Sequence, residues 1–178
     1  MNNDIPTPRL LLRPLTEFDA TQTYADWLND PSVNQYLETR HEFQTIDSCR
    51  AFIEFCNQDL YSHLFGIFLK ENDMHIGNAK LGYVNKHHCT AELSMFIGEK
   101  TLWGKGFATE TVYNLTKYGF NVLELERIQA GCYEENLVSL HIFLKLRYTV
   151  EGFFRRHVNS KGRRSGCFWL GILKDEFV

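Results

Sequence analysis

The residues that could do chemistry concentrate in one stretch, AELSMFIGEKTLWGKGFATE, at residues 91–110. A strand-like alternation of apolar and polar residues runs into a loop that contains Gly104 and Gly106, and the loop opens a helix. Glycines let several backbone N–H groups approach one anion, and the N-terminus of a helix adds a partial positive charge. The stretch therefore predicts an anion-binding loop, although two glycines before a helix also occur in ordinary helix-entry turns.

Other patterns that carry chemistry are missing from the sequence. The loop lacks both the GxxxxGK pattern followed by Ser or Thr and the complete GxGxxG fingerprint, which makes ATP and NAD poor candidates. The seven histidines show no HxxxH or HExxH spacing and the five cysteines no CxxC pair, which argues against a metal site and a disulfide framework. No cysteine has a recognisable His and Asp partner. A ping-pong mechanism, in which a cysteine thiol forms a covalent intermediate with the transferred group, is therefore disfavoured.

The composition limits the classes of function. The 178 residues, 44% of them hydrophobic, predict a single domain over residues 1–178. Nineteen Lys and Arg against 22 Asp and Glu give a formal net charge of −3, which argues against a nucleic-acid partner. Residues 155–164 are nevertheless basic and contain no acid. This basic segment predicts either recognition of an acidic acceptor or a solvated hairpin tip.

The sequence also bears on where the protein acts. No apolar run approaches the ~18 residues of a membrane span, and the first ten residues, MNNDIPTPRL, lack the charged and apolar regions of a signal peptide. We therefore expect a cytoplasmic protein without a membrane partner.

The order of predicted elements indicates an α+β fold. Seven strands are expected, over residues 9–13, 64–69, 75–84, 90–97, 127–133, 148–154 and 167–173. Helices are expected over 18–28, from a cap at Thr45 or Asp47 through Cys56, over 108–122 and over 137–146. Because a crossover helix joins them, the strands at 90–97 and 127–133 should pair in parallel within a mostly antiparallel sheet.

With this context, the loop resembles the pyrophosphate loop of the GNAT superfamily of acetyl-CoA-dependent N-acetyltransferases, which reads Gln or Arg, two residues, Gly, one residue, Gly or Ala. The matching residues are WGKGFA at 103–108, with Trp103 where Gln or Arg is usual. WGKGFATE, TPRLLLRPL, NLVSLHIFLKLRYTVEGFFR and GILKDEF are similar to the branch that contains the ribosomal-protein N-terminal acetyltransferases. The resemblance implies a three-layer fold, with helices on both faces of the sheet and a strand pair that splays apart at the cofactor site.

The resemblance further implies acetyl-CoA as acetyl donor and no metal. Backbone groups of Phe96 and Ile97 would pair with pantetheine. Asn136 would bind the pantetheine arm and Lys145 a CoA phosphate, although a helix cap and a solvated surface lysine are the competing interpretations. The loop and helix start that would contact CoA comprise Trp103, Gly104, Lys105, Gly106, Phe107, Ala108 and Thr109.

Catalytic roles follow from the same resemblance. Glu92 matches the strand glutamate that acts as general base, a role that partial burial favours because it raises the pKa of a carboxyl. The competing interpretation is an ion pair with a neighbouring cation. Ser139 would protonate the departing CoA thiolate or merely cap a helix, and Tyr148 is the alternative acid. The implied reaction is direct transfer to a primary amine, without a covalent enzyme intermediate.

The acceptor side is less defined. In this superfamily the segment between the first two helices lines the acceptor cleft, so Tyr36, Arg40 and His41 are candidate contacts, or they pack the helix junction. Glu92 and Arg155 complete the candidate set. Members of the branch often carry Asp just before the last strand, where this chain has Gly166.

The identity of the amine stays open. HIGNAKLG and YLETRH also look similar to acetyltransferases of nucleotide-linked amino sugars, which favours a small or sugar-borne amine over a protein N-terminus. A catalytically silent acyl-CoA sensor and a nucleic-acid-binding module are the other classes, disfavoured by the catalytic residues and by the net charge. Superfamily members often pair through late strands, so a homodimer is compatible with the resemblance.

Overall fold

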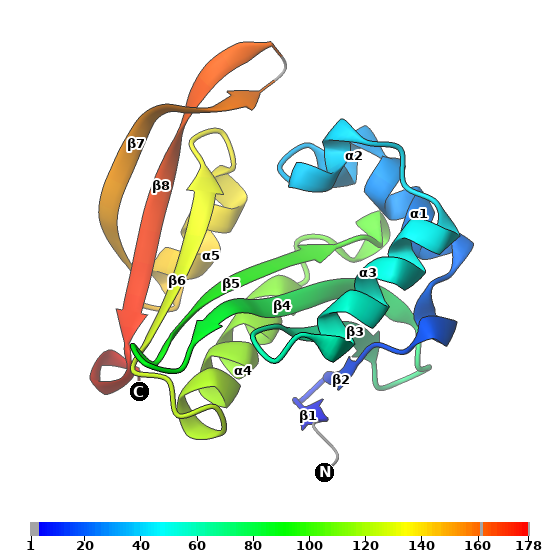
Figure 1. Cartoon of the computed structure of the whole chain (residues 1–178), viewed down its shortest axis with the longest axis horizontal. Helices are drawn as coiled ribbons and strands as arrows, with labels where there is room; N and C mark the ends of the chain where they lie inside the picture. The colour runs from blue at the N-terminus through cyan, green and yellow to red at the C-terminus, as the bar shows by residue number, and fades with distance from the viewer. Residues whose placement is uncertain (1–3, 161, 178) are drawn as a thin grey trace.

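The computed structural model describes residues 4–160 and 162–177. Its centre is an eight-stranded sheet in the order β1-β2-β3-β4-β5-β6-β8-β7 (Figure 1). Every neighbouring pair is antiparallel except β5 and β6, which pair in parallel. The predicted α+β class and the parallel crossover are confirmed. The additional strand is β1, whose two residues are too few to show a periodicity.

The strands are β1 (Ile5–Pro6), β2 (Leu10–Pro14), β3 (His63–Leu69), β4 (His75–Asn85), β5 (Thr90–Ile97), β6 (Arg127–Tyr133), β7 (Thr149–Ser160) and β8 (Arg163–Leu173). The α-helices are α1 (Gln22–Asn29), α2 (Pro31–Asn34), α3 (Ile46–Gln58), α4 (Phe107–Asn121) and α5 (Leu137–Lys145). Short 3₁₀ turns are η1 (Glu17–Asp19), η2 (Glu38–His41), η3 (Lys100–Leu102) and η4 (Lys174–Glu176).

Helices cover both faces of the sheet, as Figure 1 shows. On one face, Val112 and Leu115 of α4 and Phe143 of α5 pack against the strands in the larger buried cluster. On the other face, residues of α1 and α3 such as Ile53 form a second cluster with the start of β3. Burial of these apolar side chains on two faces supplies the main driving force for the three-layer arrangement.

Local sequence signals set the helix starts. Thr45 caps α3, because its Oγ1 accepts from Ser48 N at 3.1 Å while Ser48 Oγ accepts from Thr45 N at 2.9 Å. Asp47 lies in the first turn of α3 rather than at the cap. In β5, Ala91 and Leu93 are buried on one face, whereas Ser94 is exposed on the other, as the alternation predicts.

Strands β5 and β6 separate soon after they meet. They pair only over Thr90–Glu92 and Arg127–Gln129. Beyond that point β5 continues to Ile97 beside β4, and β6 continues to Tyr133 beside β8, so the two strands diverge (Figure 1). The splayed strand pair expected from the sequence is confirmed.

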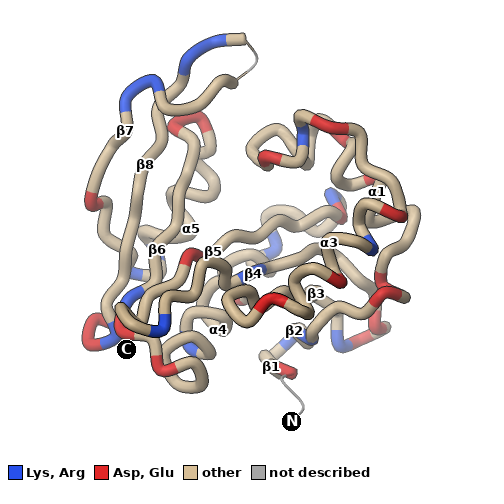
Figure 2. Tube along the Cα trace, viewed as in Figure 1, with Lys and Arg blue, Asp and Glu red and all other residues tan. Residues whose placement is uncertain are grey.

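The last two strands form a longer hairpin than the sequence pattern predicted. The basic segment was expected to lie between strands, but β7 runs to Ser160 and β8 begins at Arg163, so most of it is strand. Polar residues can extend the ladder here because both arms pair with each other at an exposed end. Figure 2 shows the Lys and Arg positions gathered toward the far end of this hairpin.

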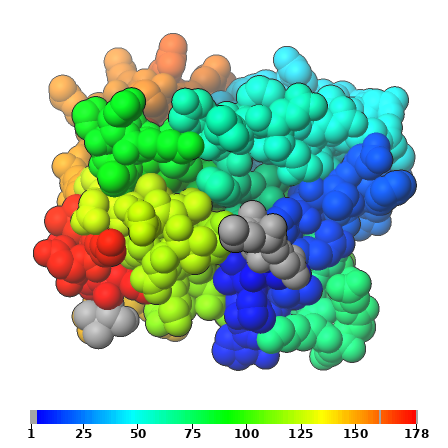
Figure 3. Space-filling model, turned by 60° about the horizontal axis from the view of Figure 1, so that its bottom comes forward, coloured from blue at the N-terminus to red at the C-terminus, as the bar shows by residue number. Residues whose placement is uncertain are grey.

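The N-terminal strands reach the helix that follows the glycine loop. In the space-filling view, the dark-blue N-terminal segment lies against the yellow-green α4 (Figure 3). The start of the chain and residues about a hundred positions later therefore belong to one structural unit, which bears on how the loop is held.

Candidate functional site

The glycine loop before α4 has the geometry of an anion-binding loop. Gly104 and Gly106 have φ values of +74° and +82°, in the left-handed region that favours glycine. The first α4 backbone bond closes from Glu110 N to Gly106 O at 3.0 Å. The amides of Phe107, Ala108 and Thr109 therefore precede the first intrahelical donor and are free to meet an anion at the helix N-terminus.

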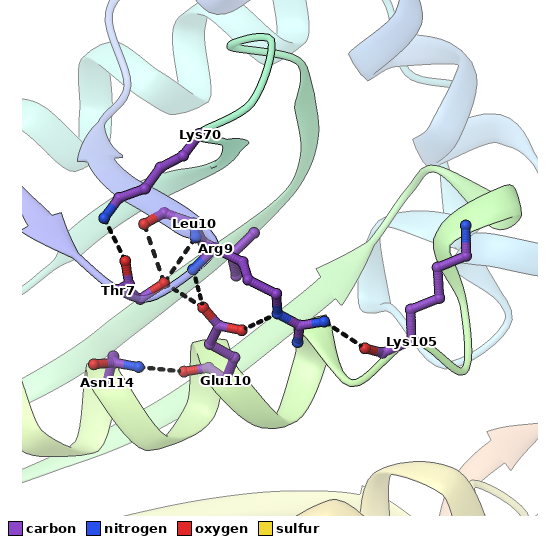
Figure 4. A network of polar contacts seen from close by, with 7 residues as sticks. All are labelled: Thr7, Arg9, Leu10, Lys70, Lys105, Glu110 and Asn114. Atoms are coloured by element: carbon purple, nitrogen blue, oxygen red, sulfur yellow. Dashed lines mark hydrogen bonds and ion pairs between the residues drawn. The ribbon is translucent and has the colours of Figure 1, made fainter.

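A polar network holds this loop in place (Figure 4). The Glu110 carboxylate accepts from Arg9 Nε at 2.7 Å, from Arg9 N at 2.8 Å and from Thr7 Oγ1 at 2.5 Å. Arg9 also donates from Nη1 to the Lys105 carbonyl at 2.9 Å and lies 4.3 Å above the Phe107 ring. Lys70 donates to the Thr7 carbonyl. The network joins the N-terminal strands to both the loop and α4.

Sequence reasoning found the loop but not this network. Its partners are about a hundred positions apart, and no short motif links them. The available signal is the TPRLLLRPL stretch, whose similarity to the resembled branch assigns no role to Thr7 or Arg9.

Trp103 lies where the loop leaves the sheet. Its indole Nε1 donates to the Ile97 carbonyl at 2.8 Å, which ties the loop to the end of β5. This gives the tryptophan at the first loop position a defined structural role.

Backbone alternation decides which β5 groups face the splay. Gly98 N donates to Ile76 O, across β4. The backbone N–H and C=O groups of successive strand residues point to opposite edges of the strand. Those of Phe96 therefore also point to β4, and those of Met95 and Ile97 point to the splayed edge. The structure therefore turns the backbone groups of Phe96 toward β4 and not toward the splay, where the pantetheine contact was expected, and the Phe96 ring stacks with Tyr24. At Ile97 the carbonyl is taken by Trp103 and the amide faces the splay.

A cleft of about 750 Å³ opens on the face of the sheet that carries Glu92. Its floor comes from β4 and β5 and its walls from α1, η2 and α3 on one side and the β6–β8 end of the sheet on the other. The expected residues that line it are Tyr36, Arg40, His41, Glu92, Phe96 and Asn136. The structure thus brings the segment 36–41 and Glu92 to one cavity.

Glu92 is half-buried at the floor of this cleft. Burial raises the pKa of its carboxyl above the ordinary value, although the charge of Lys80 and a hydrogen bond with Gln129 oppose the rise. A carboxylate with a raised pKa takes up a proton more readily than an exposed one, which is the property a general base needs.

Arg40 and Tyr36 also join two walls of the cleft. Arg40 donates to Tyr133 Oη at 2.9 Å and to the Asn159 carbonyl at 3.1 Å, so it ties η2 to β6 and to the hairpin. Tyr36 donates to the Glu135 carbonyl at 3.3 Å. The segment 36–41 thus both lines the cleft and packs against its neighbours, and its contacts fix the width of the cleft.

The start of α5 places Asn136 and Ser139 beside the splay. Asn136 Oδ1 accepts from Ser139 N at 3.2 Å, so Asn136 caps the helix. The Ser139 hydroxyl lies 3.4 Å from Cys132 Sγ of β6. Burial raises the pKa of Cys132 to about 11, so this thiol stays protonated at neutral pH.

Tyr148, the alternative acid in the sequence analysis, is corrected by the structure. It is 2% exposed in the core, packed against Phe143, and its hydroxyl shares a 2.7 Å hydrogen bond with Thr116. Burial raises its pKa further above the ordinary value. Its hydroxyl is therefore engaged inside the protein and does not reach the cleft.

Two of the predicted cationic contacts lie apart from the cleft. Arg155 is exposed on β7, where it adjoins Phe153, Phe154 and Arg156 in a separate shallow hollow, so the structure does not bring it to the cleft with the other candidate acceptor contacts. Lys145 is exposed at the end of α5, which fits the solvated-surface interpretation.

Gly166 departs from the Asp of the resembled branch for a steric reason. A Cβ at this position would lie 2.1 Å from the Phe153 ring and 2.5 Å from Glu134 Oε2. An aspartate would require the Phe153 ring and the Glu134 side chain to move and would place a second carboxylate beside that of Glu134.

Within residues 4–160 and 162–177, no group of three or more His, Cys, Asp or Glu side chains could hold a metal ion. In the same described part of the chain, no helix is long and apolar enough to cross a membrane.

Comparisons with known proteins agree on the family. A family model described as "Acetyltransferase (GNAT) domain" matches residues 9–149. An uncharacterized N-acetyltransferase p20 of Bacillus licheniformis is 32% identical over 175 residues, 97% of each chain. The spermidine N(1)-acetyltransferase of Escherichia coli strain K12 is 36% identical over 102 residues, 57% of this chain and 54% of that one.

Solved structures share the fold. A GNAT-family acetyltransferase from Bacillus anthracis superposes with a TM-score of 0.82 at 24% identity, over 97% of this chain and 99% of that one. A spermidine N-acetyltransferase from Vibrio cholerae, in complex with CoA and spermine, gives a TM-score of 0.85 at 22% identity, over 94% and 97%.

The loop network leads to a stability prediction. Glu110→Gln should lower the free energy of unfolding by about 1–3 kcal/mol at pH 7, since it weakens charge-assisted bonds to Arg9. Although burial opposes it, the hydrogen bonds from Thr7 and Arg9 hold the pKa of Glu110 below its ordinary value. A carboxyl whose pKa is lower in the folded than in the unfolded state stabilises the folded protein at pH values above its unfolded-state pKa. The difference in the free energy of unfolding between wild type and Glu110→Gln should therefore vanish as the pH falls through the folded-state pKa.

Urea unfolding between pH 3 and pH 7 measures this difference. Glu126→Gln is the matched control, because the Glu126 side chain is 64% exposed in a 3.3 Å pair with Lys174 and should change stability by no more than about 0.5 kcal/mol. Equal effects of the two substitutions at pH 7 would refute the clamping role of Glu110.

Proposed function

The chain belongs to the acetyltransferase (GNAT) domain family and is an N-acetyltransferase, and from this premise we propose that it moves the acetyl group of acetyl-CoA directly to the primary amine of a small molecule. The observation that carries the proposal is the half-buried Glu92 with a raised pKa at the floor of a cleft, on the strand whose far end leads into the anion-binding loop. Placement in the ribosomal-protein branch stays a prediction.

The CoA part of the site rests on neutral backbone groups. The amides of residues 104–109 would meet the pyrophosphate, and the edge of β5 at Met95 and Ile97 would pair with the pantetheine arm, beside Asn136. Bound acetyl-CoA supplies an activated thioester. The chain's own contribution is to hold that thioester in the splay, next to the Glu92 end of the cleft.

Proton transfers complete the proposed reaction. Glu92 takes a proton from the ammonium of the acceptor, directly or through one water, and passes it to solvent. The free amine attacks the acetyl carbonyl carbon, the C–N bond forms and the C–S bond breaks. Ser139 donates its proton to the CoA thiolate, and the remaining extra proton on nitrogen restores the serine hydroxyl, so charges and protons balance.

The size and closure of the cleft support a small acceptor. About 750 Å³ is within the usual range for small-molecule sites. Arg40 joins η2 to the hairpin across one end, which narrows the approach for a folded protein partner. The similarity to spermidine acetyltransferases makes a polyamine the second candidate. A sugar-borne amine and a protein N-terminus remain further alternatives.

Isothermal titration tests the cofactor half of the proposal. We expect acetyl-CoA to bind with micromolar affinity to one site per chain. Pantetheine alone should bind far more weakly, because it lacks the pyrophosphate that the loop would hold. Absence of acetyl-CoA binding at millimolar concentration would refute the proposal.

Glu92→Gln tests the base. It should lower kcat/KM by about 10²–10⁴-fold with little effect on acetyl-CoA affinity. Because the base must be ionised and its pKa is raised, the wild-type rate should climb with pH through a value above the ordinary glutamate pKa, and the variant should lose that limb. Glu126→Gln is the matched surface control. An unchanged pH profile in Glu92→Gln would exclude Glu92 as the base.

Ser139→Ala tests the acid. We expect acetyl-CoA affinity within about tenfold of wild type and a kcat lower by about 10²-fold. Tyr148→Phe is the contrasting variant. It should leave kcat within about twofold and only lower stability, by about 1 kcal/mol for the lost bond to Thr116. The opposite pattern, a kcat loss confined to Tyr148→Phe, would return the acid role to Tyr148.

A further inference from the structure

The strand register assembles a set of side chains around Glu92 on the cleft face of the sheet. Gly82 of β4 lies opposite Glu92, Lys80 lies opposite Ser94, and Gln129 of β6 lies beside Glu92. One step further, Trp169 of β8 pairs with Gly131. Because side chains two residues apart share a face, Lys80 and Trp169 stand on the same face as Glu92, on opposite sides of it.

Lys80 projects along this face toward the space above Gly82. A Cβ on Gly82 would lie 3.5 Å from Lys80 Nζ. The ammonium also lies 5.4 Å from the centre of the Phe52 ring and 5.8 Å from that of Tyr83. In the described part of the chain, Lys80 takes part in none of the ion pairs. Lys80 is therefore a half-buried cation whose charge acts on Glu92 and Asp59 but which forms no direct ion pair with either carboxylate.

One further donor in the cleft lacks an acceptor. The Asn78 side chain is engaged by the protein, because its Oδ1 lies 2.7 Å from His75 Nε2 and its amide adjoins the Tyr24 hydroxyl. Nε1 of Trp169, by contrast, is buried with no acceptor in hydrogen-bonding geometry among the described residues, and its ring covers the bare Gly131 at 3.8 Å from the Cβ position. A buried donor without a partner is costly, so Trp169 Nε1 indicates an acceptor atom that arrives with a ligand.

The carboxylates in the cleft are already engaged by the protein. Glu38 accepts from Tyr133 Oη and pairs with Arg40 and His41. Although burial opposes it, these contacts hold the pKa of Glu38 below its ordinary value. Apart from Glu92, which interacts with Gln129 and with the charge of Lys80, the cleft thus offers a ligand the free Trp169 donor and the Lys80 ammonium rather than a spare negative charge.

We infer that the acceptor is a primary amine that also carries an anionic oxygen group, a carboxylate or a phosphate, which Lys80 binds while the amine faces Glu92. The inference rests on the proposed function and specifies the substrate class for that site. Diagonal neighbours on adjacent strands are about 7–8 Å apart, so only a short spacer separates the two groups. Trp169 Nε1, on the other side of Glu92, donates to a further oxygen atom of the acceptor.

Matched amine pairs test the substrate class. The pairs are glucosamine 6-phosphate with glucosamine and L-methionine with L-methioninamide, and spermidine represents acceptors with several positive charges. Thiol release from acetyl-CoA should give at least one member that carries the anionic group a kcat/KM at least tenfold above that of its partner without that group and of spermidine. The two pairs distinguish a phosphate from a carboxylate as the anion.

Lys80→Met identifies the residue responsible. It should raise the KM for the preferred anionic amine by at least tenfold. At a pH where Glu92 is ionised, kcat should stay within about threefold of wild type. The KM of the partner amine without the anionic group should change by no more than about twofold. Lys80→Arg should restore most of the affinity. Lys117→Met, an exposed lysine of α4, is the matched control and should behave as wild type.

The outcomes separate this inference from the proposed function. The inference would be overturned, and acetyl transfer left intact, if spermidine or the amines without an anionic group were turned over at least as efficiently as the anionic amines. Bound acetyl-CoA with no turnover of any anionic amine would also overturn the inference. Failure to bind acetyl-CoA would instead refute the proposed function. Equal KM changes for both members of a pair in a folded Lys80→Met protein would remove Lys80 from anion recognition.

Discussion

The divergence of β5 from β6 is the constraint on which the rest of the structure depends. The two strands share only three paired residues, and each is then held by its other neighbour, β4 or β8. A sheet normally gains by continuing its ladder, because buried N–H and C=O groups without partners are costly. The splay therefore persists only because antiparallel pairing and two hydrophobic layers fix each strand independently.

The surroundings of the splay limit its cost and shape it into a site. Trp103 satisfies the Ile97 carbonyl, and Asn136 caps α5, which begins directly after β6. Arg9 holds the loop by its carbonyl and α4 by Glu110. Each contact uses a polar group of the protein to position another, so the loop amides and the β5 edge are set before any ligand arrives. Such preorganisation is what a transferase that works by positioning requires.

The sequence predicted what depends on local pattern. The cap at the start of α3 and the alternation in β5 are properties of neighbouring residues, and the parallel pairing of β5 with β6 follows from the helix that joins them. The structure places Tyr148, Arg155 and the backbone of Phe96 away from the expected contacts, because their surroundings depend on packing or register. Lys80, Asn78 and Trp169 come together only through the pairing of four strands, and Arg9 meets Glu110 across 101 positions, so neither set leaves a compact motif.

The central claim is that the diverging strands and the glycine loop together receive acetyl-CoA. Amide hydrogen exchange with and without acetyl-CoA tests it most directly, because it reports on individual backbone N–H groups along the chain. The account predicts slower exchange on binding at residues 104–109 and at Ile97, with little change in the exposed hairpin residues 155–160. Protection confined to the hairpin, with no change in the loop or at the end of β5, would contradict the account.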